Sequence, residues 1–128
     1  MKLNSNASSV SPTVIAKSFD VSFPLSPDQL DKLLKAAGIY QLPDLAVVGR
    51  NGVVKIQVRD KKNDTSNDFA ITVGETDDAF EFNFKVENIK ILPGTYDVVV
   101  SKKLLSRFTC QNYNLKYYIA LEPDSTFE

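Results

Sequence analysis

The residues with the clearest capacity for chemistry are four clustered acids, Glu75, Asp77, Asp78 and Glu81. Clustered carboxylates can hold a calcium ion, but an EF-hand loop needs fixed offsets and a glycine at its sixth position, and that spacing is missing. A carboxylate pair can cleave a glycosidic bond, yet nothing in the sequence singles out such a pair. The cluster is therefore predicted to be a solvated turn without a metal ion.

Other groups that support catalysis are scarce in this chain. Histidine is absent, which excludes Ser-His-Asp and Cys-His catalysis as well as histidine metal ligands. The glycines are isolated, so no Gly-rich phosphate loop is present. The single cysteine, Cys110, permits no intrachain disulfide and is predicted to be a buried thiol in a strand. The sequence predicts a protein that is not an enzyme and uses no cofactor.

Length and composition predict one folded domain. The chain has 128 residues, 43% of them hydrophobic, and a net charge of −1, which argues against a surface that is basic throughout but allows one basic face. Residues 1–12, rich in Ser and Asn, are predicted to be a linker or tail, and residues 13–128 the domain. No apolar run approaches the ~20 residues of a membrane span, so no membrane partner is predicted.

The element best suited to position charged side chains is a predicted helix that begins at Ser26. Ser26 can cap the helix, Pro27 suits its first position, and Gln29 completes a capping box. Gly38 fits the left-handed position after the last turn. The apolar face repeats at helical spacing through Leu30, Leu33, Leu34 and Ala37.

Predicted strands surround this helix. One runs from Val14 to Phe23, and those after the helix cover residues 45–48, 53–59 and 69–73, with Asn51-Gly52 as a hairpin turn. The pattern then begins again with a strand at residues 80–84. A short helix from Val86 to Leu92, which could equally be a continued strand, precedes strands at 95–100, 104–111 and 115–121. The chain therefore reads strand, helix and three strands, twice, which predicts an α+β fold.

Local sequences in the second half resemble those of a known family. The run from Phe82 to Tyr96 passes from an Asn-Phe strand through Asn-x-Lys-Ile into Pro-Gly-x-Tyr, and is similar to the second-domain run of T-even phage DNA sliding clamps. The end, Tyr118 to Thr126, resembles the acidic Asp-Ser-Thr terminus of those clamps. Leu115 to Ala120 is similar to the last strand of the proliferating cell nuclear antigen, the eukaryotic clamp.

This resemblance, which covers residues 13–127, implies a carboxy-terminal DNA clamp domain with two helices packed on antiparallel sheets and an internal pseudo-twofold repeat. It implies a processivity factor: a trimeric ring that encircles double-stranded DNA without sequence preference and tethers a DNA polymerase. The expected partners are the polymerase, a clamp loader and two further copies in the full-length protein, in the cytoplasm of the phage's host. The alternative is a β-rich virion or baseplate module without a DNA role.

Helices line the hole in this family, so the resemblance implies that their lysines face DNA. Lys32 and Lys35 lie away from the apolar face of the first helix, and Lys85 and Lys90 belong to the second. From Lys85 to Lys116 there are six basic residues against two acidic ones. Lysines on the outer face of a helix are, however, usually only solvated.

Two docking surfaces are also implied by the resemblance. The pocket for an apolar anchor of partner proteins corresponds to Tyr118, Leu121 and Pro123, of which Leu121 and Pro123 are expected to be exposed at a strand end. The subunit interface corresponds to one edge strand, formed by Phe69, Ala70, Ile71, Thr72 and Val73. The simpler alternatives are a core strand face for the first and an internal strand for the second.

Overall fold

The computed structural model describes residues 20–63 and 68–127. The elements of the first half are β2 (Val21–Leu25), α2 (Pro27–Tyr40), β3 (Asp44–Arg50), β4 (Val53–Arg59) and β5 (Phe69–Glu75). Those of the second half are β6 (Phe80–Lys85), η1 (Val86–Ile89), β7 (Tyr96–Ser101), β8 (Leu105–Cys110), β9 (Leu115–Ala120) and β10 (Thr126–Phe127). The predicted linker at 1–12, and the predicted strand start at Val14, lie outside the described residues.

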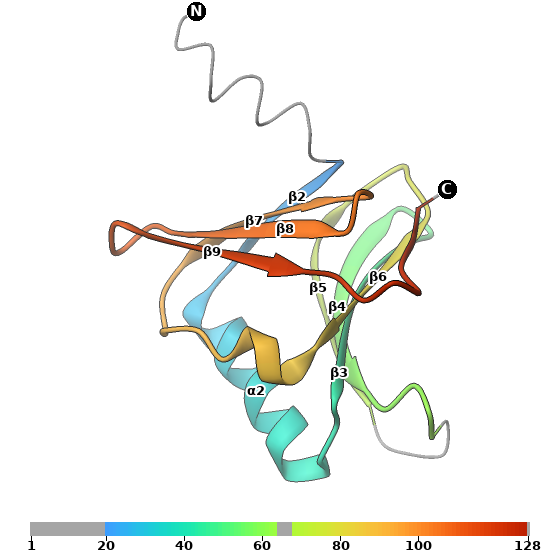
Figure 1. Cartoon of the computed structure of the whole chain (residues 1–128), viewed down its shortest axis with the longest axis horizontal. Helices are drawn as coiled ribbons and strands as arrows, with labels where there is room; N and C mark the ends of the chain where they lie inside the picture. The colour runs from blue at the N-terminus through green and yellow to red at the C-terminus, as the bar shows by residue number, and fades with distance from the viewer. Residues whose placement is uncertain (1–19, 64–67, 128) are drawn as a thin grey trace, which may run out of the picture.

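The strands form two antiparallel sheets (Figure 1). The β3 sheet has the order β10-β6-β3-β4-β5, and the β7 sheet has the order β2-β7-β8-β9. Each sheet therefore takes three successive strands from one half of the chain and is completed by strands of the other half. In the β3 sheet these are β6, which pairs with β3, and β10, which pairs with β6; in the β7 sheet it is β2, which pairs with β7. This confirms the predicted α+β class. The pseudo-twofold rotation stays a prediction, since strand pairing does not fix the rotation between halves.

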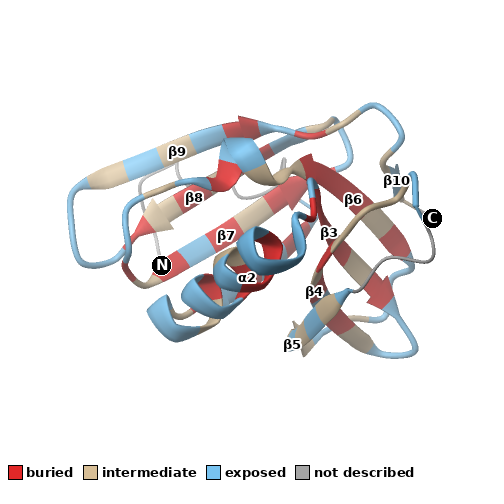
Figure 2. Ribbon diagram, turned by 90° about the horizontal axis from the view of Figure 1, so that it is seen from below, coloured by how far each residue is buried: buried red, intermediate tan, exposed pale blue. Residues whose placement is uncertain are grey.

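The hydrophobic core lies between the two sheets and beneath α2. Leu33 of α2, Phe84 of β6 and Val98 of β7 are each 0% exposed and belong to one continuous cluster. Buried residues gather where the helix faces the strands, as Figure 2 shows. The charged side chains that could act on a partner are consequently those on the outer face of α2, on the outer faces of the sheets and in the turns.

Helix α2 begins as predicted and ends later than predicted. The Gln29 N–H donates to the Ser26 hydroxyl at 3.1 Å, and the Ser26 N–H donates to the Gln29 side-chain oxygen at 3.0 Å. The placement of Gly38 after the last turn was wrong, because the helix continues to Tyr40 and Gln41 adopts the left-handed conformation with φ of 56°. The helix end thus lies three residues beyond the predicted stop, next to Leu42, which is 3% exposed and part of the core.

The second predicted helix, over Val86 to Leu92, is shorter than predicted: the segment forms the 3-10 helix η1 (Val86–Ile89), and it does not continue strand β6, which ends at Lys85. The residue before it, Lys85, makes no side-chain cap hydrogen bond, and Pro93 disfavours helical backbone at Leu92. Burial of Ile89 at 1% exposure holds the segment against the core. Within residues 20–63 and 68–127, the structure therefore has one α-helix and one 3-10 helix, and the two α-helices that the resemblance implied stay a prediction.

Two shorter features complete the fold. Asn51 and Gly52 have φ of 56° and 84°, and the two positive angles confirm the predicted turn between β3 and β4. Strand β10 was not predicted, because two residues carry too little pattern to read; it pairs with β6 at the end of the β3 sheet. This pairing places the carboxy-terminal segment beside the second half's first strand.

Candidate DNA-facing surface and docking surfaces

Helix α2 and the segment of residues 85–93, here called the η1 segment, lie side by side (Figure 1). A hollow of about 490 Å³ between them is lined by Leu34, Ala37, Gly38, Gln41, Leu42, Pro43, Lys85, Val86, Glu87 and Lys90. A smaller hollow of about 70 Å³ continues along the helix between Asp31 and Pro93, and Leu34 lines both. The structure thus places on one surface the two segments that were predicted to face DNA.

The α2 lysines are exposed, but each has an acidic partner on the same helix. The Lys32 ammonium lies 3.1 Å from the Asp28 carboxylate, and the Lys35 ammonium lies 3.1 Å from the Asp31 carboxylate. The lysine side chains are 59% and 72% exposed. Sequence reasoning missed the two aspartates, although their spacing of four residues from each lysine was a visible signal.

The two lysines of the η1 segment differ in their surroundings. The Lys85 ammonium lies 3.1 Å from the Asp44 carboxylate, which is 2% exposed. The hydrogen bond to Asp44, followed by its charge, raises the pKa of Lys85 above the ordinary value. Lys90 is exposed and makes no ion pair within residues 20–63 and 68–127. Lys85 therefore has a structural partner, whereas Lys90 is available for an external anion.

The basic excess between Lys85 and Lys116 does not form one patch. Only Lys85 and Lys90 belong to the η1 segment. Arg107 and Lys116 alternate with core residues on β8 and β9, so they face outward from the β7 sheet. Lys102 and Lys103 lie in the turn between β7 and β8. A count along the sequence could not separate these surfaces, because the strands carry successive side chains to opposite faces.

The acidic cluster of Glu75, Asp77, Asp78 and Glu81 does not share one environment. The Glu81 carboxylate lies 2.9 Å from the Arg59 guanidinium, while Asp77 and Asp78 are exposed in the turn between β5 and β6. Across the described parts of the chain, no group of three or more acidic, Cys or His side chains is arranged to hold a metal ion. Glu81 thus has a structural role, because its ion pair with Arg59 connects β6 to β4.

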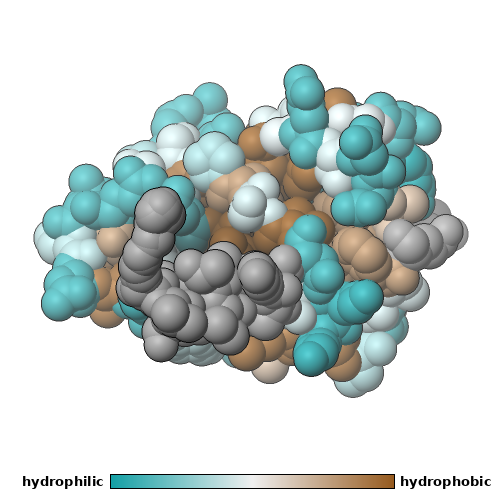
Figure 3. All heavy atoms as spheres, turned by 90° about the horizontal axis from the view of Figure 1, so that it is seen from above, coloured by the Kyte–Doolittle hydropathy of each residue, from teal (hydrophilic) through white to brown (hydrophobic). Residues whose placement is uncertain are grey.

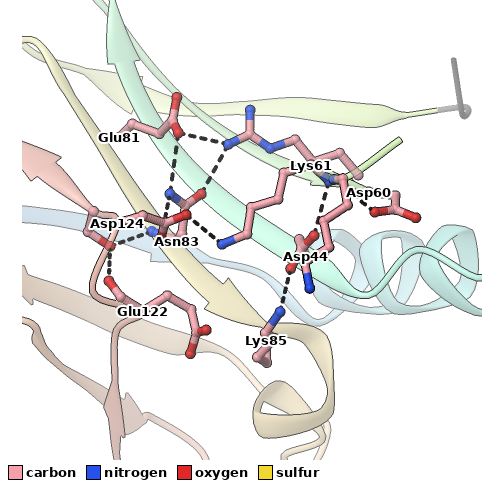
Figure 4. Close-up of polar contacts among 11 residues, drawn as sticks. Asp44, Asp60, Lys61, Glu81, Asn83, Lys85, Glu122 and Asp124 are labelled. Atoms are coloured by element: carbon pink, nitrogen blue, oxygen red, sulfur yellow. Dashed lines mark hydrogen bonds and ion pairs between the residues drawn. The ribbon is translucent and has the colours of Figure 1, made fainter. Parts of the chain in front are cut away.

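The carboxy-terminal segment, residues 121–127, is fixed to the β3 sheet by a polar network (Figure 4). Asn83, 1% exposed, donates its backbone N–H to Ser125 and its side-chain amide to Asp124, and its carbonyl accepts from the Glu122 N–H at 2.7 Å. Lys61 donates to Asp124 at 2.7 Å. This bond lowers the pKa of the Asp124 carboxyl, although partial burial opposes the shift.

The three residues that were predicted to form a peptide pocket differ in their exposure. Tyr118 is 61% exposed and Pro123 is also exposed, but the expected exposure of Leu121 was wrong, because it is 6% exposed and part of the core. The alternation of β9 continues into Leu121, which places it on the core side with Ile119 and opposite Tyr118. The structure does not bring Leu121 and Tyr118 to one surface.

Tyr118 instead belongs to the outer face of the β7 sheet. Arg107 on β8 lies directly opposite Tyr118 on β9, and Leu105 lies opposite Ala120. Leu105 is 41% exposed. Figure 3 shows apolar surface at the middle of the face opposite α2, with hydrophilic side chains around it. The exposed apolar side chains near the chain end are thus on the sheet, not in a terminal pocket.

Among the residues that the structure describes, the predicted interface strand lies at a sheet edge. Strand β5 contains Phe69, Ala70, Ile71, Thr72 and Val73. It is last in the order of the β3 sheet, and its neighbour there is β4. Ala70 and Thr72 are exposed, whereas the alternate residues are partly buried against the core. In the described residues, β9 is likewise last in its sheet. Both strands leave backbone groups that another strand could pair with.

The helices in the described residues include none that is long and apolar enough to cross a membrane.

Comparison with known proteins gives a family. The profile of the family described as "gp45 sliding clamp, C terminal" matches residues 22–123. The chain is 26% identical over 131 residues to the sliding clamp of Escherichia phage RB69 and 28% identical over 131 residues to that of Enterobacteria phage T4. Each match covers 91% of this chain and 57% of the relative. The sliding clamp of Vibrio phage KVP40 is 31% identical over 104 residues, covering 78% of this chain and 46% of that clamp.

Two antiparallel sheets with one packed helix, matched over most of their length by clamp sequences, define the class as a DNA clamp domain. The chain belongs to the gp45 sliding clamp family and corresponds to its carboxy-terminal domain. This membership argues against the virion or baseplate alternative. The chain spans little more than half the length of the RB69 and T4 relatives.

Proposed function

We propose that the chain acts as the carboxy-terminal half of a clamp subunit that encircles double-stranded DNA and tethers a DNA polymerase during phage replication. The observation that carries this proposal is the family match over residues 22–123. In this role the chain is an accessory protein without catalysis, and its partners are duplex DNA, the polymerase and a clamp loader. It works in the cytoplasm of the infected host.

In this proposal the surface formed by α2 and the η1 segment faces the duplex. It carries Lys32, Lys35 and Lys90 as exposed cations, and Lys85 beside them. Contacts to phosphate through lysines are independent of sequence and weaken with salt, as sliding requires. The geometry offers few cations, so the proposed DNA contact is sparse.

Processive synthesis by the polymerase with the complete gene product tests this surface. Charge reversal by Lys32→Glu with Lys35→Glu is expected to shorten the products made in one binding event while the domain stays folded. The matched control is Lys62→Glu with Lys103→Glu, which makes the same charge change in two exposed turns. Equal processivity for both double variants would remove α2 from the proposed lining.

The second part of the proposal is partner docking near the carboxy terminus, at Tyr118, Leu121 and Pro123. Leu121 contributes by holding the segment in place, because it is buried, whereas Tyr118 and Pro123 are exposed for contact. Binding of a labelled polymerase-tail peptide should weaken with Tyr118→Ala and not with Tyr113→Ala. Tyr113 is 60% exposed in the β8–β9 turn and is therefore a close control. If the two variants bind alike, Tyr118 has no role in docking.

The third part is the subunit contact, for which we propose antiparallel pairing along β5. The support is its edge position and the exposure of Ala70 and Thr72. A lysine on an edge strand discourages pairing, so Ala70→Lys should dissociate the complete clamp. Ser22→Lys, at an exposed position of β2, the first strand of its sheet among the described residues, should not. Small-angle scattering of the unsubstituted complete gene product should show a closed trimer, and that of Ala70→Lys should show monomers. A monomer or fibre for the unsubstituted protein, or an intact trimer for Ala70→Lys, would contradict the proposal.

A further inference from the structure

The charges of α2 sum to zero on a surface that is proposed to face a polyanion. Between Pro27 and Tyr40 the charged residues are two aspartates and two lysines. All four side chains are between 57% and 75% exposed, so none is used to hold the core. A helix that attracted DNA through its lysines would gain from neutral residues at positions 28 and 31, where this chain has carboxylates.

The two pairs have the geometry of local charge compensation. Each aspartate precedes its lysine by four residues, which brings the side chains together on one helix face. Both ammonium-to-carboxylate distances are 3.1 Å. A DNA phosphate that approaches Lys32 or Lys35 must therefore compete with a carboxylate already in contact, and is itself repelled by that carboxylate. This repulsion acts well inside the screening length of about 8 Å at physiological salt.

Lys90 provides the contrast on the same surface. It is exposed on the η1 segment and makes no ion pair with the acidic residues that the structure describes. The nearest acidic residue in sequence, Glu87, also lies on the rim of the hollow beside α2. The surface thus has one lysine without an ion pair on the η1 segment and two compensated lysines on α2, a distribution that a count of lysines does not reveal.

We propose that Asp28 and Asp31 limit the contact of Lys32 and Lys35 with phosphate, so that α2 lets the duplex pass and Lys90 carries the stronger contact. This inference rests on the proposed function, because it requires α2 to face DNA. The pairs are weak enough to open when a phosphate comes close, since both partners are exposed to water. Each contact is consequently brief, and the aspartates set how strongly the helix holds DNA.

Binding of a short labelled duplex, measured by fluorescence anisotropy over a series of salt concentrations, tests the proposal on the whole 128-residue chain. Asp28→Asn with Asp31→Asn should tighten binding and steepen the dependence of log K on log salt. Two additional phosphate contacts would change that slope by about 2. The control, Asp77→Asn with Asp78→Asn, removes the same charge from the exposed β5–β6 turn and should leave the slope unchanged.

Neutralising the lysines separates failure of this inference from failure of the proposed function. Lys90→Gln should weaken wild-type binding more than Lys32→Gln with Lys35→Gln does. If neither change weakens binding beyond that of Lys62→Gln with Lys103→Gln, the surface does not face DNA and the proposed function fails. If the lysine variants weaken binding but the two aspartate pairs behave alike, the function stands and the compensation proposal is overturned.

A loss of helix could imitate a negative result, because the pairs also support α2. Circular dichroism identifies it, and Asp31→Asn alone then serves as the second variant. It keeps Asp28 in the first turn, where an acidic side chain favours the helix start. A folded Asp31→Asn variant with an unchanged salt slope contradicts the proposal, whereas a steeper slope supports it.

Discussion

Helix α2 and η1 follow the first strand of their respective halves, yet different interactions hold them. Helix α2 has 14 residues, a capping box and two ion pairs within its own sequence. The four residues of η1 have no side-chain cap. The Val86 N–H instead donates to the Pro43 carbonyl at 2.9 Å, Lys85 binds Asp44, and Ile89 is buried.

This difference shows which interactions determine the stability and the exposed charge of each segment. Local interactions define α2, including the compensation of its lysines. Tertiary contacts define η1, and they leave one lysine paired with β3 and the other exposed. Substitutions that remove a tertiary contact of η1 should therefore lower the stability of the domain substantially. Substitutions that remove a local signal of α2 should lower it less.

The largest effect is expected from Ile89→Ala in η1. Ile89 is 1% exposed, and truncating a buried isoleucine typically costs about 3 kcal/mol, from lost burial and the cavity left behind. Urea denaturation should show that loss in the free energy of unfolding. Asn88→Ala, at an exposed neighbouring position, should change it little. A loss for Ile89→Ala no larger than for Asn88→Ala would show that η1 is not held by burial.

Removal of the cap should have a smaller effect on α2. Ser26→Ala deletes the hydroxyl that accepts from the Gln29 N–H, and loss of such a cap typically costs about 1 kcal/mol. Thermal unfolding measures the change, with Ser22→Ala on an exposed position of β2 as the control. If the two serine variants unfold at the same temperature, the capping box does not stabilise this helix.

Gly38→Ala should stabilise α2, by about 0.5–1 kcal/mol, because glycine in a helix costs conformational entropy. A Cβ at position 38 would meet nothing within 4 Å. The contrasting variant is Gly49→Ala on β3, where the added Cβ would collide with the Phe80 ring, so that it should destabilise. Stabilisation by both changes, or by neither, would contradict the placement of these two glycines.

The same contrast explains what the sequence could predict. Ser26, Pro27 and Gln29 announce the start of α2, and Asn51-Gly52 the hairpin, because their signals act over a few residues. The end of α2 depends on burial of Leu42 by elements distant in sequence, so Gly38 was misleading. The extent of η1 depends on contacts with β3 in the same way. Features set by interactions between neighbouring residues were thus predicted correctly, whereas features set by contacts between residues distant in sequence were not.

The candidate site was predictable in part for the same reason. Exposure of Lys32 and Lys35 followed from the helix period, and their pairing was readable from the spacing of Asp28 and Asp31. The pairing of Lys85 with Asp44 joins residues 41 positions apart, and nothing local indicates it. Leu121 was expected to be exposed because it ends a strand, but the polar network of residues 122–125 holds it against the core.

The smallest effect concerns the pH dependence of the Lys85 ion pair. Its bond to Asp44 raises the folded-state pKa of Lys85 above the ordinary 10.5. The pair's contribution is therefore fully present below that ordinary value and is lost as pH rises through the folded pKa. Stability should fall between about pH 8 and about pH 11 by less in Lys85→Gln than in the wild type.

The difference between the two proteins isolates Lys85 from other alkaline titrations. Burial raises the pKa of Tyr96 to about 12, so the folded state also resists ionisation of this tyrosine, but Tyr96 is present in both proteins and cancels. Urea midpoints at the two pH values give the comparison. An equal fall in wild type and Lys85→Gln would mean that the Lys85 pair adds nothing, and that η1 depends on Ile89 and its backbone contacts alone.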